Sequence, residues 1–296
     1  MSTFPQFTKL QLSDKDRIEH IVARFAPYSD FNFTSLYCWN VDETAEFSIV
    51  SGDTLVIKIP DYLTGEPVYS LIGGRMLDST IYDVVTVVDN LRLVPESAIA
   101  SLADPKKFVI TEDRDQFDYV YNLSDLTALS GKKFSTIRNK VNQFSHAHPN
   151  YHFSIIDSIS DRERQQMKNI FTKWAEEKES SNDEIRMERE AIDRFITGMV
   201  LDRMVAIIMY IDDDPVGFSI NEITRTGEYA ICHWQKTLHA YTNCDSVLTL
   251  YSSNILLERG CRLVNWEQDL GISGLRQLKQ SYRPVEFLKK YSIKLA

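Results

Sequence analysis

The feature that most constrains the fold is a run of three strand patterns in the second half of the chain. Two short polar turns separate them, Asp212-Asp213-Asp214-Pro215 and Arg225-Thr226-Gly227, and the three segments are residues 204–211, 216–223 and 228–234. Turns this short join antiparallel neighbours, so the segments predict a three-stranded meander. A helix over residues 245–259, ended by Gly260, and a buried strand over 262–266 are predicted to follow.

Two helices are predicted ahead of this meander. The first is capped by Asp161 and has apolar residues spaced at i, i+3, i+4 and i+7, namely Met167, Ile170, Phe171 and Trp174. The second carries Met187, Ala191, Ile192 and Phe195 on one face. The second half therefore reads as a helix pair, a meander, a helix and a strand.

The first half shows a similar order of elements. Helices are predicted over residues 14–25 and 79–91, and strands over 46–50, 55–59, 68–72, 107–110 and 118–121. We predict an α/β (α+β) fold with mixed central sheets flanked by helices. The polar segment around Pro149 suggests two domains, residues 1–148 and 149–296.

The composition narrows the classes of protein that this chain can belong to. Its 296 residues are 43% hydrophobic and 25% charged, which is ordinary for a globular protein. No apolar run approaches the roughly 18 residues of a membrane span, and the N-terminal residues lack a signal-peptide pattern, so a cytoplasmic location is expected. The four cysteines lack zinc-ligand spacing, and buried free thiols are expected.

A net charge of −9 repels nucleic acids on average, so any such binding requires a local basic surface. One candidate is the segment from Leu126 to Ile156, which contains no acidic residue. Its candidate phosphate-binding residues are Lys132, Lys133, Arg138 and Lys140. They project from a predicted helix whose apolar face is formed by Phe134, Ile137, Val141 and Phe144. A solvated linker helix is the alternative interpretation.

The second candidate surface follows the last predicted strand. Arg276, Lys279 and Arg283 recur at near-helical spacing and form one positive stripe just after Glu267 and Asp269. A donor whose phosphates bind the stripe would present its ester to these carboxylates. Glu267 or Asp269 could then orient an attacking hydroxyl or hold a cationic amine. Structural salt bridges are the alternative.

Three segments resemble a bacterial family of uncharacterised proteins related to the catalytic C-terminal domain of phosphatidylglycerol lysyltransferases. The resemblance lies in residues 31–39, in 112–121 continuing through 129–133 to 138–140, and in 265–271 through Arg276 to 282–284. It implies tandem GNAT-like acyltransferase domains, also similar to those of the enzymes that form peptidoglycan bridges. It further implies aminoacyl-tRNA as a possible donor, with an unidentified acceptor.

No cofactor or metal is predicted. GNAT enzymes that use acyl-coenzyme A have a glycine-rich loop at the pyrophosphate, but residues 236–245 contain no glycine. Gly73-Gly74 in the first half is interpreted as a strand-to-helix turn. No Ser or Cys lies in a nucleophile-elbow pattern, and His233 is interpreted as a structural histidine within a sheet.

These patterns lead to two hypotheses of different classes. The first is an aminoacyl or acyl transferase that binds its donor between the two halves and acts by positioning and electrostatic stabilisation. The second is a non-catalytic tandem GNAT-like module that binds RNA or another phosphate-rich ligand.

Overall fold

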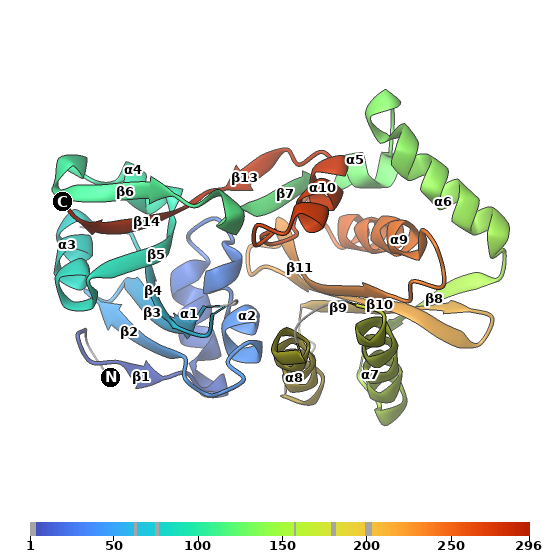
Figure 1. Cartoon of the computed structure of the whole chain (residues 1–296), viewed down its shortest axis with the longest axis horizontal. Coiled ribbons are helices and arrows are strands. Elements are labelled where there is room, and N and C mark those ends of the chain that lie inside the picture. Colours follow the sequence, from blue (N-terminus) through green and yellow to red (C-terminus); the bar gives the residue numbers. More distant parts are fainter. Residues whose placement is uncertain (1–3, 62–63, 75–76, 157, 179–181, 199–202) are drawn as a thin grey trace. The chain divides into compact units, whose positions relative to one another are not determined.

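The computed structural model describes residues 4–61, 64–74, 77–156, 158–178, 182–198 and 203–296 (Figure 1). The chain forms two compact units. Unit 1 comprises residues 1–118, 268–273 and 287–296, and unit 2 comprises 119–267 and 274–286. The mixed α/β class predicted from the sequence is confirmed. The two units are discontinuous in sequence, unlike the single boundary at residue 148 that the turn residues suggest.

Unit 1 begins with two helices and a meander. Its elements are β1 (Thr8–Lys9), α1 (Lys15–Val22), α2 (Phe33–Cys38), β2 (Glu46–Val50), β3 (Thr54–Pro60), β4 (Pro67–Ile72), α3 (Leu77–Val88), β5 (Asn90–Pro95), α4 (Glu96–Ala100), β6 (Phe108–Glu112) and β14 (Lys290–Leu295). Strands β1 to β4 form an antiparallel sheet in sequence order. Ser51 and Gly52 turn β2 into β3 with left-handed backbone angles, which glycine adopts without steric cost.

A second sheet of unit 1 recruits the C-terminal strand. Its order is β5-β14-β6, so β14 pairs with a strand on each side. The apolar face of α3 packs against both sheets, where Ile81, Val84 and Val85 join Val56 of β3 and Ile293 of β14 in one buried cluster. The fully buried ammonium of Lys290 contacts the carboxylates of Asp30 and Asp118, which are also fully buried.

Unit 2 is built on a seven-stranded sheet of order β13-β7-β12-β11-β10-β9-β8. Its strands are β7 (Asp118–Asn122), β8 (Tyr151–Ile156), β9 (Met204–Ile211), β10 (Asp214–Ile223), β11 (Tyr229–Thr237), β12 (Leu263–Asn265) and β13 (Glu286–Leu288). Its helices are α5 (Leu123–Ala128), α6 (Ser135–Ala147), α7 (Asp161–Glu176), α8 (Asn182–Gly198), α9 (Cys244–Glu258) and α10 (Ser273–Ser281). Helix α9 covers one face of the sheet, and α7 and α8 cover the other (Figure 1).

The same order of elements occurs in both units. Helices α1 and α2, the meander β2-β3-β4, helix α3 and strand β5 of unit 1 correspond to α7 and α8, β9-β10-β11, α9 and β12 of unit 2. This repetition is the tandem GNAT-like arrangement predicted from the sequence. Among the described helices, none has both the length and the apolar character that a membrane crossing requires.

Candidate active site

The candidate site lies in unit 2, where the pairing of two parallel strands ends. Strands β11 and β12 pair over only three residues each, and the last pair is Ile231 with Asn265. His233 and Glu267 each follow two residues beyond this pair. Because paired parallel strands run in step, equal offsets bring the two side chains together. The Nδ1 atom of His233 lies 3.2 Å from Oε1 of Glu267.

An irregularity in β11 sets the position of His233. Ile220 of β10 pairs with Trp234, but the next residue, Asn221, pairs with Cys232, so His233 is an extra residue in β11. Such a β-bulge redirects the side chain of the extra residue and is common beside functional sites. The imidazole of His233 lies 5.7 Å from the ring of Trp234, measured between ring centroids.

His233 bridges two carboxylates. Its Nε2 lies 3.1 Å from Oε2 of Glu222 on β10, and Arg203 lies 4.0 Å from the other oxygen of Glu222. The side chains of His233 and Glu222 are 1% and 3% exposed, whereas that of Glu267 is 22% exposed. Glu267 is therefore the member of this triad that a ligand can reach.

The charge of His233 follows from these contacts. Burial disfavours the charged ring, but the hydrogen bonds to Glu222 and Glu267 outweigh burial and raise the pKa of His233 to about 9. At neutral pH the ring is an imidazolium that donates one N–H to each carboxylate. His233 consequently orients Glu267 at this pH and has no free lone pair with which to act as a base.

The backbone of Glu267 is held in an uncommon conformation. Its φ of 58° lies in the left-handed region, which side chains other than glycine seldom adopt. The N–H of Glu267 donates to Oδ1 of Asn265 over 2.6 Å. Its carbonyl accepts hydrogen bonds from the Tyr119 N–H at 3.2 Å and from the Lys279 ammonium at 3.2 Å. Three partners thus fix the peptide that carries the accessible carboxylate.

A comparison with protein families matches residues 23–294 to the family described as Phosphatidylglycerol lysyltransferase, C-terminal. The chain belongs to this family. The comparison with curated proteins gives no match. The relation of the lysyltransferase C-terminal family to aminoacyl transfer supports a transferase function of that type for this chain.

Solved structures share the fold along nearly the whole chain. A conserved protein of unknown function from Bacteroides thetaiotaomicron is 26% identical, with 98% of this chain and 99% of that chain covered and a TM-score of 0.83. The structure of L-PGS from Bacillus licheniformis is 14% identical, with 95% and 92% covered and a TM-score of 0.64. FemX is 7% identical, with 98% and 97% covered and a TM-score of 0.60.

Asp269, the second carboxylate predicted for the site, belongs to unit 1. It is fully buried. Its Oδ1 accepts the N–H of Gly271 at 2.9 Å, and its Oδ2 lies 3.4 Å from the guanidinium of Arg114. These contacts stabilise the segment that follows Gln268, and burial keeps the carboxylate from solvent. Glu267 and Asp269 are close along the chain, but Glu267 contacts His233 whereas Asp269 pairs with Arg114.

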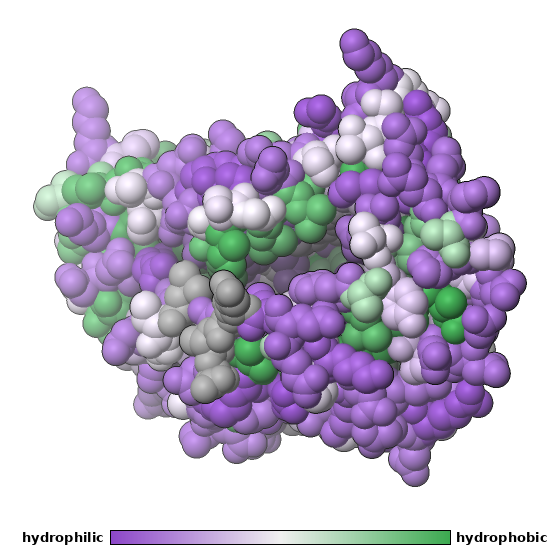
Figure 2. All heavy atoms as spheres, turned by 45° about the vertical axis from the view of Figure 1, so that its right-hand side comes forward, coloured by the Kyte–Doolittle hydropathy of each residue, from purple (hydrophilic) through white to green (hydrophobic). Residues whose placement is uncertain are grey.

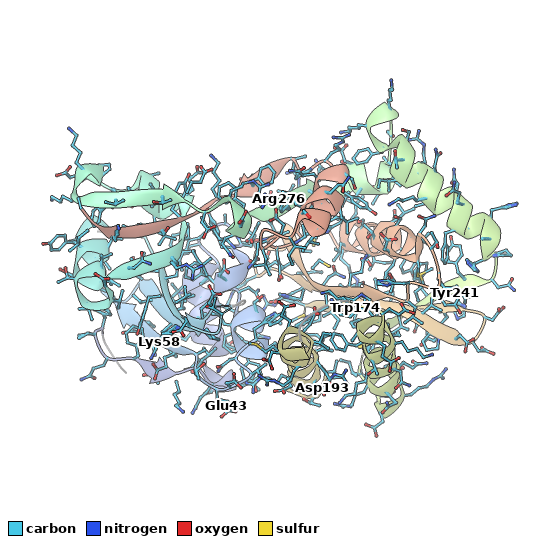
Figure 3. The ribbon with its side chains drawn as sticks, viewed as in Figure 1. Glu43, Lys58, Trp174, Asp193, Tyr241 and Arg276 are labelled. Carbon is cyan, nitrogen blue, oxygen red and sulfur yellow. The ribbon has the colours of Figure 1, made fainter. Side chains whose placement is uncertain are left out.

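The three cations of the predicted stripe have different environments. Lys279 is buried, and its ammonium donates to the carbonyls of Trp266 and Glu267. Arg276 is half-buried on α10 (Figure 3), and Arg283 is exposed after the helix ends. The prediction that all three present charge to a phosphate chain is therefore not met by Lys279, because this ammonium is turned inward to bind backbone carbonyls.

The basic segment around α6 lies on the surface of unit 2. The predicted apolar face is present, since Phe134, Ile137 and Phe144 are buried. Lys133 pairs with Asp125 at 2.9 Å, and Arg138 donates to the carbonyls of Leu129 and Gly131. Lys132 is exposed and Lys140 is half-buried. The part of Figure 2 at the upper right, where α6 lies, is predominantly hydrophilic.

Other chemistry predicted from the sequence can also be placed. Cys38, Cys244 and Cys261 are buried free thiols, and Cys232 is a half-buried one. Burial, with a contribution from Glu267, raises the pKa of Cys232 to about 12, so a thiolate is disfavoured beside the site. Within the described ranges, no group of His, Cys, Asp and Glu side chains is arranged to hold a metal ion.

The sequence interpretation missed His233 as the partner of Glu267, and Glu222 as the second partner of His233. The available signal was the register of two strands. If the last paired residues of β11 and β12 are known, the equal offsets of His233 and Glu267 place them together. A single sequence does not supply that register, and the extra residue of the bulge is not marked by glycine or proline.

Proposed function

We propose that this protein is an aminoacyl or acyl transferase whose catalytic carboxylate is Glu267. The observation that carries the proposal is one solvent-accessible carboxylate held by a buried imidazolium. His233 occupies Oε1 of Glu267, and across the described residues Oε2 accepts no hydrogen bond. A carboxylate oxygen in this state can accept a hydrogen bond from a hydroxyl or an amine.

The proposed role of Glu267 is to orient the reacting group. Its Oε2 accepts a hydrogen bond from the attacking hydroxyl or amine of the acceptor, or holds the ammonium of the aminoacyl group. A bond forms between the attacking atom and the carbonyl carbon of the donor, and the bond to the leaving oxygen breaks. The proton of the attacking group ends on that leaving oxygen. No covalent enzyme intermediate is needed, and the Cys232 thiol is poorly suited to form one because its raised pKa disfavours the thiolate.

The proposed donor is aminoacyl-tRNA, with an acceptor that stays unidentified. Membership of the lysyltransferase C-terminal family and the fold shared with FemX support this donor. Lys132 and Lys140 near α6, and Arg276 and Arg283 near α10, are the proposed phosphate contacts, because their side chains are exposed or half-buried on unit 2. Lys133 and Arg138 are also proposed, and together with Arg276 they are weaker contributors, since each of the three already has a partner within the chain.

The test follows the loss of label from radiolabelled lysyl-tRNA in the presence of phosphatidylglycerol vesicles. A parallel reaction uses tRNA charged with a mixture of labelled amino acids. Replacing Glu267 by Gln keeps the size of the side chain but changes its hydrogen bonding, and we expect transfer to fall by about 100-fold. Donor binding should change little, because the phosphate contacts remain.

Asp269→Asn is the matched control, since it makes the same carboxylate-to-amide change in unit 1. The folded fraction of this variant should keep its transfer activity. Full activity of Glu267→Gln would remove the catalytic assignment. If the native protein binds both tRNA preparations in a salt-dependent manner and consumes neither, the result supports the rival interpretation as a non-catalytic module that binds RNA or another phosphate-rich ligand. The acid-free α6 segment is the feature that favours that rival.

A further inference from the structure

The ammonium of Lys279 binds groups within unit 2. The residue is 8% exposed, and its ammonium lies 2.6 Å from the carbonyl oxygen of Trp266 and 3.2 Å from that of Glu267. A buried lysine is costly unless its charge is compensated by hydrogen bonds. Here two consecutive carbonyls of the loop after β12 provide that compensation. The Lys279 ammonium thus binds the carbonyl oxygens of the two residues that the Trp266–Glu267 peptide bond joins.

Lys279 is itself fixed at its other end. The carbonyl of Lys279 accepts a hydrogen bond from the hydroxyl of Tyr121 on β7 at 2.8 Å. Tyr121 is fully buried, and its ring lies 4.2 Å from that of Trp266, measured between centroids. Helix α10 is therefore anchored to the sheet at the residue whose side chain binds the loop. Movement of the Lys279 ammonium would require movement of the helix or of its own side chain.

The opposite side of the Glu267 peptide is held by Asn265. This side chain is fully buried and accepts the N–H of Glu267 at 2.6 Å. The left-handed backbone at Glu267 needs such support, because an unsupported residue with a β-carbon leaves this conformation. A relaxed backbone would point the Glu267 side chain in another direction. The contact of Oε1 with His233 would then be lost.

We propose that Lys279 is a positioning residue, which holds the Glu267 backbone in its left-handed conformation so that the carboxylate reaches both His233 and the substrate. This inference rests on the proposed function of Glu267. It replaces the role in phosphate binding that the spacing of α10 suggests for Lys279. A phosphate-binding lysine would act on donor affinity, whereas a positioning lysine acts on the reacting group.

The first experiment reads the position of Glu267 without any activity. The His233 ring is titrated by NMR in the native protein, in Lys279→Met and in Glu267→Gln. The hydrogen bond to Glu267 raises the pKa of His233, so its loss in Glu267→Gln should lower that pKa. Lys279→Met should produce a similar fall, because the carboxylate is displaced. An unchanged His233 titration in folded Lys279→Met would overturn the proposal.

Lys236→Met provides a control for the loss of a largely buried lysine. The Lys236 ammonium lies 2.7 Å from Glu188 and 3.8 Å from the centroid of the Trp174 ring, which Figure 3 labels on α7. It makes no hydrogen bond to Glu267 or His233 among the described contacts. This variant should lose stability and leave the His233 titration unchanged. An equal pKa fall in Lys236→Met would mean that the readout reports general loosening, and the proposal would fail.

The second experiment separates kcat from KM in the lysyl-tRNA assay. Lys279→Met should lower kcat by at least about 10-fold with the KM for the donor within about two-fold, and Lys279→Arg should restore part of kcat. A raised KM with native kcat would identify Lys279 as a phosphate ligand and overturn the inference. Native kcat in Lys279→Met together with an inactive Glu267→Gln would defeat only the positioning role. Native activity of Glu267→Gln would defeat the proposed function itself.

If Lys279→Met does not fold, Tyr121→Phe decides the matter, because it removes only the hydroxyl that anchors α10. The expected result is a smaller fall in the His233 pKa in the same direction. A native titration in Tyr121→Phe would then count against the anchored lysine.

Discussion

At the scale of single residues, the charge of His233 makes the stability of the folded chain depend on pH. Its two hydrogen bonds exist only in the folded chain, so they make the folded pKa higher than that of the unfolded chain, which is about 6.5. Folding therefore favours proton binding at this ring. The contribution to stability is complete below about pH 6.5, declines as pH rises, and is lost above about pH 9.

We predict that the free energy of unfolding falls as the pH rises from about 6.5 to 9. A shift of this size corresponds to roughly 3 to 4 kcal/mol at most, since one pKa unit is about 1.4 kcal/mol. Urea unfolding at several pH values measures the effect. His233→Gln should lose this part of the pH dependence. The interpretation fails if the native protein and His233→Gln have parallel stability profiles over this range.

The residue scale also shows what a single sequence could predict of the site. Glu267 was predicted because it precedes a cationic segment, and it does contact Lys279 through its backbone. The inward orientation of the Lys279 side chain could not be predicted, because helical spacing does not say which face of α10 is buried. The position of His233 between Cys232 and Trp234 on a predicted strand indicates a structural histidine. It does not reveal the partners Glu222 and Glu267, which are 11 and 34 residues away in sequence.

At the scale of elements, most helices and strands agree with their sequence patterns. The predicted strand at residues 46–50 is β2, and the predicted strand at 204–211 is β9. Gly260 follows the end of α9 with a φ of 94°, as its predicted role requires. The sequence predicts these elements because hydrophobic periodicity and turn residues are local properties. It does not predict sheet order, which depends on distant segments.

The start of α7 corrects one local prediction. Asp161 was expected to cap this helix, but Ser160 is the N-cap and forms a capping box with Glu163. Both residues favour helix starts, and the reciprocal bonds to Glu163 decide between them. The hydrogen bonds to Ser160 lower the pKa of Glu163. The helix therefore begins with an acidic first turn, which suits its dipole.

We predict that Ser160→Ala lowers the free energy of unfolding by about 1 kcal/mol, because an N–H at the helix start loses its partner. Asp161→Ala is the comparison, and it should cost less than half as much. Urea denaturation of both variants gives the two values. Equal losses would show that the capping box contributes nothing beyond the charge of the first turn.

At the scale of the whole molecule, the two units share the chain in an interleaved way. Unit 1 needs residues 268–273 and 287–296 as well as the first 118, and unit 2 needs residues from 119 onward. The sheet pairings explain why a single cut cannot separate them. Strand β14 lies between β5 and β6, and β7 pairs with β12. Turn residues alone do not reveal such pairings, so a boundary at Pro149 looked sufficient in the sequence.

We predict that a fragment of residues 149–296 does not unfold cooperatively. It lacks β7, which leaves the edge of β12 unpaired, and it carries β14 without β5 and β6. Circular dichroism during urea titration should show a broad, shallow transition. A chain of residues 1–286 lacks β14, which leaves β5 and β6 without their shared partner. Unit 1 of this chain should therefore not unfold cooperatively. A sharp transition in the 149–296 fragment would instead support independent domains.

The central place of β14 has a consequence for the order of events during synthesis. The ribosome makes β5 and β6 long before residues 290–295, so the sheet that needs β14 between them stays incomplete until late in translation. Asp30 and Asp118 likewise wait for Lys290 before their charges are neutralised. The earliest part of the nascent chain is thus among the last to reach its final structure. Its unpaired strand edges are what a ribosome-associated chaperone would encounter.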